Sequence, residues 1–262
     1  MEPILEVKHL SMNFGGLKAL DQVDLNVMPG EITALIGPNG AGKTTFFNCI
    51  TGIYTPTEGD IFVGLPGVGR ENISGVDIHK ITQRGLARTF QNIHLFPDMT
   101  VLENVMIGRH CRTKAGILGA ILRDQATKNE ERSIVARSYD ILEKIGLTDY
   151  VNLLARNLPY GAQRRLEIAR AIATDPFLLL LDEPAAGMNP QETKELETLL
   201  TSICNEGKIS ILLIEHDMRL VMSLSDCVYV MDYGEMIARG TPQEIRKDPA
   251  VIKAYLGEDI HA

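Results

Sequence analysis

The sequence predicts an α/β fold with a mostly parallel core sheet, an N-terminal antiparallel β subdomain and an inserted helical subdomain. Two N-terminal segments, Leu5–Leu10 and Ala19–Val27, alternate between apolar and polar residues, as antiparallel strands with one solvated face do. From Thr100 to about residue 146 the pattern is mainly helical. Three short, continuous apolar runs are typical of core strands that are buried on both faces: Ile32–Ile36, Phe177–Leu181 and Ser210–Ile214.

A glycine-rich stretch follows the first of these apolar runs and fits the pattern G-x-x-x-x-G-K-[ST] of a phosphate-binding loop. A predicted strand precedes it and a predicted helix follows it, which is the context that the motif requires. Its glycines let backbone N–H groups approach phosphates, and the helix N-terminus adds partial positive charge. Lys43 would reach the β- and γ-phosphates, and the Thr44 hydroxyl would bind Mg²⁺. The residues expected to bind the nucleotide are Gly37, Pro38, Asn39, Gly40, Ala41, Gly42, Lys43, Thr44 and Thr45.

The overall charge and the cysteines exclude several other classes of protein. The chain of 262 residues has a formal net charge of −8, which argues against broad electrostatic capture of nucleic acid. No nucleic-acid partner is therefore expected. The cysteines form no C-x-x-C pair, so neither a zinc site nor redox chemistry is indicated. Buried, reduced thiols in a cytoplasmic protein are expected at Cys49, Cys111, Cys204 and Cys227.

No segment of the sequence resembles a targeting signal or a membrane span. Residues Met1–Glu6 lack the basic region and the apolar core of a signal peptide. The longest apolar candidate, Ala115–Leu122, is far shorter than the ~20 residues that a spanning helix needs. Ordinary helix packing is the preferred interpretation of this segment, and contact with a membrane-side partner is the alternative. Any membrane role must come through a partner.

Turn and capping signals place the remaining elements. Thr100 and Glu103 form a capping-box pattern at a helix start, and Asn189–Glu192 begins a helix that ends near Gly207. Residues 228–231 and 235–238 are expected to pair as a hairpin, and Leu86–Gln91 is expected to form a strand. The glycine-rich segment Gly64–Asn72 is interpreted as a plain surface loop.

Two adjacent carboxylates, Asp182 and Glu183, follow the most apolar run of the chain. Open α/β sheets bind ligands at the carboxyl ends of their parallel strands. We expect Asp182 to hold Mg²⁺, directly or through water, and Glu183 to polarise an attacking water. At other strand ends, Gln91 could reach Mg²⁺ or the water, and His216 could contact the γ-phosphate. With the phosphate loop, these residues predict a Mg²⁺–nucleotide site.

Over essentially its whole length, the sequence resembles the ATP-binding subunits of ABC transporters. Phe14 matches the aromatic residue that stacks on adenine in that family. Besides the phosphate loop, the resemblance rests on the Q-loop Thr89–Gln91, the signature motif Leu158–Arg165, the Walker B segment Leu180–Glu183, the D-loop region Ala185–Pro190 and the H-loop Glu215–Asp217.

The resemblance implies an ATPase with the ABC ATPase fold, which has a RecA-like phosphate-loop NTPase core, and it implies ATP and Mg²⁺ as cofactors. It implies catalytic roles for Glu183, His216 and Gln91, and Mg²⁺ ligation by Thr44, Gln91 and Asp182. Gly161 of the signature motif would contact a nucleotide in a site shared between two subunits. The whole chain, 1–262, would be one ATP-binding domain. Its expected parts are a nucleotide-binding core with the antiparallel subdomain over 1–91 and 166–240, a helical subdomain over 92–165, and C-terminal helices over 241–262.

The resemblance is closer to the ATPases of branched-chain amino acid importers. It is carried by Leu158–Gly161 with Gln163–Arg170, by Thr89–Asn92, and by the ending from Gly240 to Gly257. The implied partners are a second ATP-binding subunit, two transmembrane permeases and, indirectly, a periplasmic or extracellular substrate-binding protein. The implied location is cytoplasmic, peripheral on the inner face of the cell membrane. ATPases for urea, other amino acids, amides or lipopolysaccharide are similar. Branched-chain amino acids are therefore implied as the substrate only by the resemblance, and by nothing else in the sequence.

Three positions depart from the family pattern. The family's signature is usually L-S-G-G-Q, whereas this chain has Pro159 for its serine and Tyr160 for its first central glycine. Proline supplies neither a hydroxyl nor a backbone N–H. In the D-loop region, Asn189 replaces the usual aspartate. These departures lead to the hypothesis that the two ATP sites of the working dimer are not equivalent.

Other classes of function explain the motifs less completely. A non-transport ABC ATPase of the DNA-repair type would carry a long coiled coil between the motifs, and one of the translation type would carry two tandem domains. This chain has neither. A nucleotide or small-molecule kinase would not explain the signature motif or His216.

Overall fold

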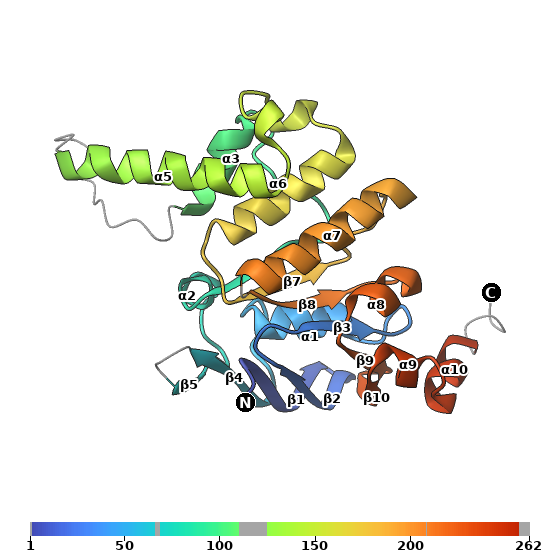
Figure 1. The fold of residues 1–262 in the computed structure, drawn as a ribbon. Coiled ribbons are helices and arrows are strands. Elements are labelled where there is room, and N and C mark those ends of the chain that lie inside the picture. Colours follow the sequence, from blue (N-terminus) through green and yellow to red (C-terminus); the bar gives the residue numbers. More distant parts are fainter. Residues whose placement is uncertain (1, 66–68, 110–124, 208, 257–262) are drawn as a thin grey trace. The chain divides into compact units, whose positions relative to one another are not determined.

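A computed structural model describes residues 2–65, 69–109, 125–207 and 209–256 (Figure 1). The chain divides into two compact units. The core unit comprises Met1–Arg88 and Phe177–Ala262, and the helical unit comprises Thr89–Pro176.

A six-stranded sheet runs through the core unit in the order β10-β9-β3-β8-β7-β6. All neighbours in it pair in parallel except β10, which pairs antiparallel with β9 as the predicted hairpin requires. Every residue of β3, β7 and β8 is buried, which confirms the prediction from their apolar runs. The strands are β3 (Ile32–Ile36), β6 (Leu86–Arg88), β7 (Leu178–Asp182), β8 (Ser210–Ile214), β9 (Cys227–Asp232) and β10 (Glu235–Gly240).

The predicted strand over Leu86–Gln91 is too long. Strand β6 ends at Arg88, and it pairs only with β7, from Leu86 opposite Leu178 to Arg88 opposite Leu180. Beyond Arg88 the chain enters the helical unit, so Thr89–Gln91 has no strand to pair with in the core sheet.

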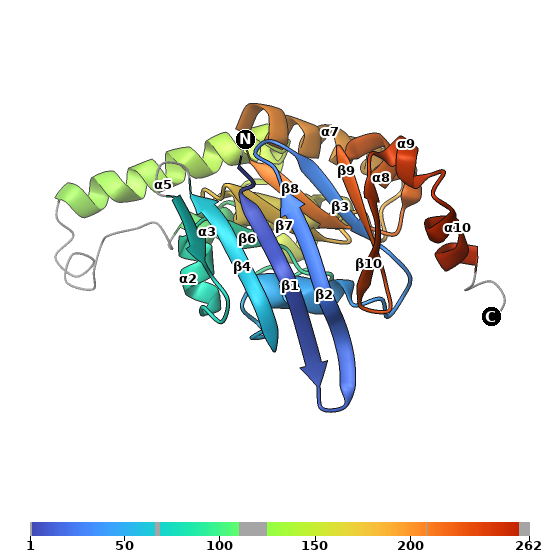
Figure 2. The same cartoon turned by 90° about the horizontal axis from the view of Figure 1, so that it is seen from below.

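A second, antiparallel sheet in the core unit has the order β2-β1-β4-β5 and is seen face-on in Figure 2. Its strands are β1 (Leu5–Phe14), β2 (Leu17–Val27), β4 (Glu58–Leu65) and β5 (Gly69–Asn72). Interpreting Gly64–Asn72 as a plain loop was wrong, because Phe62 pairs with Asn72 and Gly64 with Arg70. Strand β5 has no buried residue and no apolar alternation, so it gave no pattern to detect. It is an edge strand held by the backbone ladder and by Arg70, which lies over the Phe62 ring at 4.9 Å.

Helix α1 (Lys43–Ile50) lies between the two sheets (Figure 1). Its Phe46, Phe47 and Ile50 side chains are fully buried in a cluster that also contains residues of both sheets. The hydrophobic core of this unit is therefore built around the helix that follows the phosphate loop.

Side-chain caps mark the starts of several other helices of the core unit, including the predicted start at Asn189–Glu192. The side-chain oxygen of Asn189 accepts hydrogen bonds from the N–H groups of Gln191 and Glu192, and Thr241 with Glu244 forms a complete capping box. Asp217 caps the helix that follows His216. These helices are α2 (Ile78–Gln83), α7 (Pro190–Gly207), α8 (Met218–Leu224), α9 (Pro242–Ile245) and α10 (Pro249–Leu256).

The helical unit contains α3 (Val101–Arg109), α5 (Gln125–Lys144) and α6 (Tyr160–Ile172), with short 3-10 helices at Thr148–Tyr150 and Ala155–Asn157. Helix α3 packs against both α5 and α6. The predicted capping box at its start is confirmed, since Glu103 accepts from the Thr100 N–H at 2.8 Å. The segment Ala115–Leu122 and Cys111 lie outside the described residues. Within the described ranges, no helix is both long and apolar enough to cross a membrane.

Candidate functional site

Strand register brings three predicted motifs to one edge of the core sheet. Leu35 of β3 lies opposite Ile214 of β8, and Ile214 lies opposite Asp182 of β7. The phosphate loop begins two residues after Leu35, Glu183 follows Asp182, and His216 is two residues beyond Ile214. Because parallel strands end at the same edge, these side chains share one site.

The phosphate loop has the backbone that its glycines permit. Gly40 and Gly42 have φ values of 79° and 105°, in the left-handed region that favours glycine. A Cβ on Gly37 would lie 1.9 Å from the Met231 carbonyl oxygen, and one on Gly42 would lie 2.7 Å from that of Ala19. No larger residue fits either position, so the loop is packed closely between strands β2 and β9.

Lys43, the first residue of α1, is buried and folded onto its own loop. Its Nζ donates to the carbonyl oxygens of Gly37 at 2.6 Å and Pro38 at 2.7 Å. The ammonium group is thus held over the loop, where it can meet a phosphate. Next to it, Thr44 is exposed.

Asp182 forms a buried ion pair with Arg88, a residue that sequence analysis did not single out. The Arg88 Nη2 donates to Asp182 Oδ2 at 2.9 Å, while its Nη1 donates to Asn48 Oδ1 at 2.7 Å and Thr51 Oγ1 at 3.1 Å. The two side chains are only 7% and 4% exposed. Arg88 therefore joins the Walker B aspartate to helix α1. A charged residue at the end of an apolar strand was the signal that could have revealed it.

Glu183 and His216 contact each other directly. The Glu183 Oε1 and the His216 Nε2 are 2.7 Å apart, and the two side chains are 18% and 43% exposed. Glu183 also has a φ of 48°, so the backbone turns sharply as it leaves β7. The turn directs the Glu183 carboxylate toward the His216 imidazole, and the two side chains together can bind and orient a water.

Phe14 stands at the end of β1 with 42% of its surface exposed. Its ring meets that of Tyr54 edge-to-face, with ring centroids 5.3 Å apart. Such a contact fixes the plane of an aromatic ring. Tyr54 therefore supports the predicted adenine-stacking residue. It lies 40 residues from Phe14 in the sequence, so no local pattern signals this contact.

Two predicted site residues, Gln91 and Gly161, belong to the helical unit, so their roles at the nucleotide stay predictions. Within that unit their segments are tied together by Arg164, which is fully buried. Its two terminal nitrogens donate to the carbonyl oxygens of Phe90 and Gln91, each at 2.8 Å. Glu167 pairs with Arg164 at 3.0 Å. The Q-loop backbone is therefore fixed to helix α6, which carries the signature motif.

The start of α6 shows what the altered signature motif lacks. Pro159 is its N-cap and provides no side-chain hydrogen bond to the first turn, and Tyr160 is 44% exposed. Counted along the usual five residues of the motif, the fifth is Ala162, a further departure that sequence analysis overlooked. Gly161 itself is buried in the helix.

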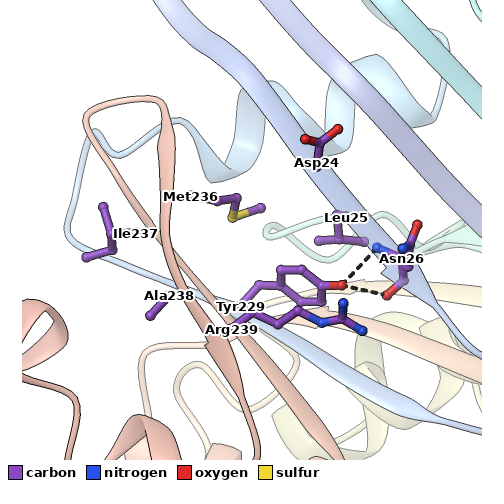
Figure 3. Close-up of a pocket in the computed structure, with 8 residues that line it drawn as sticks. All are labelled: Asp24, Leu25, Asn26, Tyr229, Met236, Ile237, Ala238 and Arg239. Atoms are coloured by element: carbon purple, nitrogen blue, oxygen red, sulfur yellow. Dashed lines mark hydrogen bonds between the residues drawn. The ribbon is translucent and has the colours of Figure 1, made fainter.

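A pocket of about 280 Å³ in the core unit is separate from the predicted nucleotide residues. It lies between β2 and the β9–β10 hairpin (Figure 3). The Tyr229 hydroxyl donates to the Asn26 carbonyl oxygen and accepts from the Asn26 N–H, and Arg239 lies over the Tyr229 ring at 5.1 Å. None of the residues that line this pocket belongs to the phosphate loop. They come from β2 of the antiparallel sheet and from β9 and β10 of the six-stranded sheet, so the pocket is a seam where the two sheets meet.

The oxygen atoms of Asp182 and Thr44 suit Mg²⁺ bound together with a nucleotide better than a metal ion that is held by protein side chains alone. Within the described part of the chain, no group of three or more His, Cys, Asp or Glu side chains could hold a metal ion. Mg²⁺ usually takes one or two carboxylates together with substrate phosphates. Only Oδ2 of Asp182 is used in its ion pair, and the Thr44 hydroxyl is exposed, so both residues retain an oxygen for the ion.

Burial keeps the described cysteines out of this chemistry. Cys49 and Cys204 are buried free thiols and Cys227 is half-buried. Desolvation raises the pKa of the Cys49 thiol to about 11, which makes it unreactive near neutral pH.

Two known protein families match parts of this chain. Residues 20–186 match the family described as ABC transporter, and residues 235–261 match the branched-chain amino acid ATP-binding cassette transporter family. The chain is 48% identical to the high-affinity branched-chain amino acid transport ATP-binding protein LivG of Escherichia coli, over 98% of this chain and 99% of that protein. It is also 48% identical to BraF of Pseudomonas aeruginosa, over 98% of each chain.

Solved structures agree. The ADP conformation of MJ1267, an ATP-binding cassette of an ABC transporter, is 32% identical with a TM-score of 0.84, over 98% of this chain and all of that one. The dimeric, post-hydrolysis cassette MJ0796 bound to ADP and Pi is only 23% identical, with a TM-score of 0.75 over 91% and 98% of the two chains, and shows the fold alone. This chain therefore belongs to the ABC transporter family, as an ATPase of the group named for branched-chain amino acid transport.

Proposed function

We propose that this chain hydrolyses ATP at the edge of its core sheet to power a transporter that imports branched-chain amino acids. The observation that carries the proposed mechanism is the 2.7 Å contact between Glu183 and His216, which is placed by strand register beside the phosphate loop. A carboxylate held by an imidazole at that point suits in-line attack of water on a γ-phosphate.

In this mechanism the protein supplies positioning and charge rather than a covalent intermediate. Lys43 and the loop N–H groups hold the β- and γ-phosphates, and Phe14 stacks on the adenine. Glu183 accepts the proton of the attacking water or orients it, and His216 keeps the carboxylate aimed. Asp182 and Thr44 would hold Mg²⁺, which would neutralise charge on the phosphate oxygens. Gln91 assists as a ligand of the ion or the water.

The working form is proposed to be a complex. A second ATP-binding subunit would complete each nucleotide site, with Gly161 and its neighbours facing the nucleotide of the other subunit. Two permeases and a substrate-binding protein would supply the membrane passage, which places this chain on the inner face of the cell membrane. Pro159, Tyr160 and Asn189 favour two non-equivalent ATP sites.

The hydrolytic role is tested by Glu183→Gln. The amide keeps the size of the side chain but cannot accept a proton, so turnover should fall about 10²- to 10⁴-fold. The Kd for ATP, measured with a fluorescent analogue, should change less than about twofold, because the loop is untouched. Glu192→Gln, at the start of α7, is a matched control that should keep full turnover. Normal turnover in Glu183→Gln would remove this residue from its role.

The substrate is tested separately by transport. The chain would be expressed with the permeases and binding protein encoded beside it, and uptake of labelled leucine measured in cells or vesicles. Uptake should depend on ATP and be competed by isoleucine and valine. Competition by urea instead would assign another substrate to the same ATPase.

A further inference from the structure

Glu215 is a buried carboxylate that the mechanism above does not use. It lies between the end of β8 and His216, and it is only 3% exposed. A carboxylate in such a place is costly unless hydrogen bonds compensate for the lost water. Its partners therefore indicate why the residue is there.

The two oxygens of Glu215 bind two different segments of the active site. Oε1 accepts from the Ala185 N–H at 2.8 Å, and Oε2 accepts from the His216 N–H at 3.1 Å. Ala185 is two residues beyond Glu183, and His216 is the partner of Glu183. One buried side chain thus connects the backbone on both sides of the catalytic contact.

The backbone at Glu183 needs such support. Its φ of 48° lies in the left-handed region, which is unfavourable for a residue with a Cβ and persists where the surroundings hold it. The Glu183 N–H donates to the Ile214 carbonyl oxygen at 2.9 Å, before the turn. The bond from Ala185 to Glu215 holds the chain just after the turn, so the two bonds enclose it.

The pKa of the Glu215 carboxyl is raised above its usual value. Desolvation is the largest cause and the nearby Glu183 charge adds to it, while hydrogen bonds from the Ala185, His216 and Asp217 N–H groups oppose the rise. All three donors are backbone groups, which cannot move away without moving the loops. The carboxylate and the two loops are therefore one connected structure.

We propose that Glu215 is a positioning residue for ATP hydrolysis, whose carboxylate ties the turn that carries Glu183 to the segment that carries His216 and so maintains their contact. The inference rests on the proposed roles of Glu183 and His216. Glu215 acts through those residues, and ATP binding at the phosphate loop does not depend on it.

The test is Glu215→Gln in the full chain. The amide has the same shape, but its NH₂ group would face backbone N–H donors on one side, either that of Ala185 or those at His216 and Asp217, so one loop would be released. We expect kcat to fall about 10- to 100-fold, the range that follows from one unsatisfied buried hydrogen bond. The Kd for a fluorescent ATP analogue should stay within about twofold. Glu215→Asp, which keeps the charge on a shorter side chain, should give an intermediate loss and serves if the Gln variant does not fold.

The matched control is Glu244→Gln at the start of α9. Glu244 also accepts from a backbone N–H, that of Thr241 at 2.7 Å, but in a helix cap apart from the catalytic contact. Its turnover should equal that of the unmodified chain. Equal losses of turnover in Glu215→Gln and Glu244→Gln would overturn the proposal.

A double-mutant cycle separates positioning from a merely structural role. In a His216→Ala background the contact that Glu215 maintains is gone, so Glu215→Gln should lower the residual kcat less than about threefold. The same factor in both backgrounds would overturn the proposal. If Glu183→Gln retains turnover, the proposed hydrolytic role fails, whatever the Glu215 variants do.

Discussion

The two units hold their functional segments in different ways. In the core unit, the side chains proposed for catalysis meet directly: Glu183 contacts His216, and Lys43 lies on its own loop. In the helical unit, the Q-loop backbone is held by two buried side chains of the signature helix, Arg164 and its partner Glu167. The first arrangement aims side chains, whereas the second fixes the path of the backbone.

This difference matches two tasks: the core unit positions side chains, and the helical unit fixes a backbone segment. Strand ends in a buried sheet are rigid, so side chains placed there keep their geometry with few extra contacts. A loop that joins two compact units has no sheet to hold it, and here a guanidinium group donating to the Phe90 and Gln91 carbonyls supplies the constraint. A change in the Q-loop would therefore be transmitted to α6 through Arg164.

The largest expected effect breaks the helical-unit arrangement. Arg164→Met leaves Glu167 buried without its cation, which should lower the free energy of unfolding by about 3–5 kcal/mol. Replacing both residues, as Arg164→Met with Glu167→Leu, should recover most of that loss. Urea unfolding of the full chain measures both. Arg156→Met, which breaks the exposed pair with Asp98, is the control and should cost less than about 1 kcal/mol. If Arg164→Met lowers the free energy of unfolding no more than the control does, the buried pair does not stabilise the helical unit.

A smaller effect breaks the core-unit arrangement. Lys43→Met removes a charged donor to phosphate, so the Kd for ATP should rise about 10- to 100-fold, corresponding to about 1.5–3 kcal/mol. Equilibrium titration with a fluorescent ATP analogue measures it. Lys18→Met, at an exposed ion pair with Asp21, should leave the Kd unchanged. Unaltered affinity in Lys43→Met would mean that the loop amides alone hold the nucleotide.

The smallest expected effect sharpens the comparison at the signature motif. Pro159→Ser gives α6 a side-chain cap worth about 0.5–2 kcal/mol, but it also loses the stiffness of proline, worth about 0.4–1 kcal/mol. Pro159→Ala loses the stiffness without gaining the cap. Urea unfolding should therefore rank the serine variant about 1 kcal/mol above the alanine variant. Equal stabilities would show that the start of α6 does not use a cap.

The sequence predicted the core-unit site because its signals are local. Buried strands are apolar runs, the loop has a fixed spacing, and Asp182, Glu183 and His216 stand at the end of a strand or within two residues of it. The pairs formed across long separations gave no such signal. Arg88 meets Asp182 across 94 residues, and Arg164 meets the Q-loop across 73 or 74.

Other differences arose where the local pattern was weak or misleading. Strand β5 was missed because its four residues are polar and its stability comes from pairing with β4. The strand before Gln91 was drawn too long because an apolar pattern continues past Arg88, where the sheet ends. Glu215 has an unremarkable position in sequence, and only its two backbone partners give it a role.

The seam in Figure 3 has a consequence for aggregation. Strand β2 is an edge of the antiparallel sheet, and exposed edges invite strands from other chains. At Asn26 the hydroxyl of Tyr229 occupies both the backbone donor and the backbone acceptor. An incoming strand would have to displace an aromatic side chain that Arg239 covers. One phenol group thus blocks strand pairing at this position of the sheet edge.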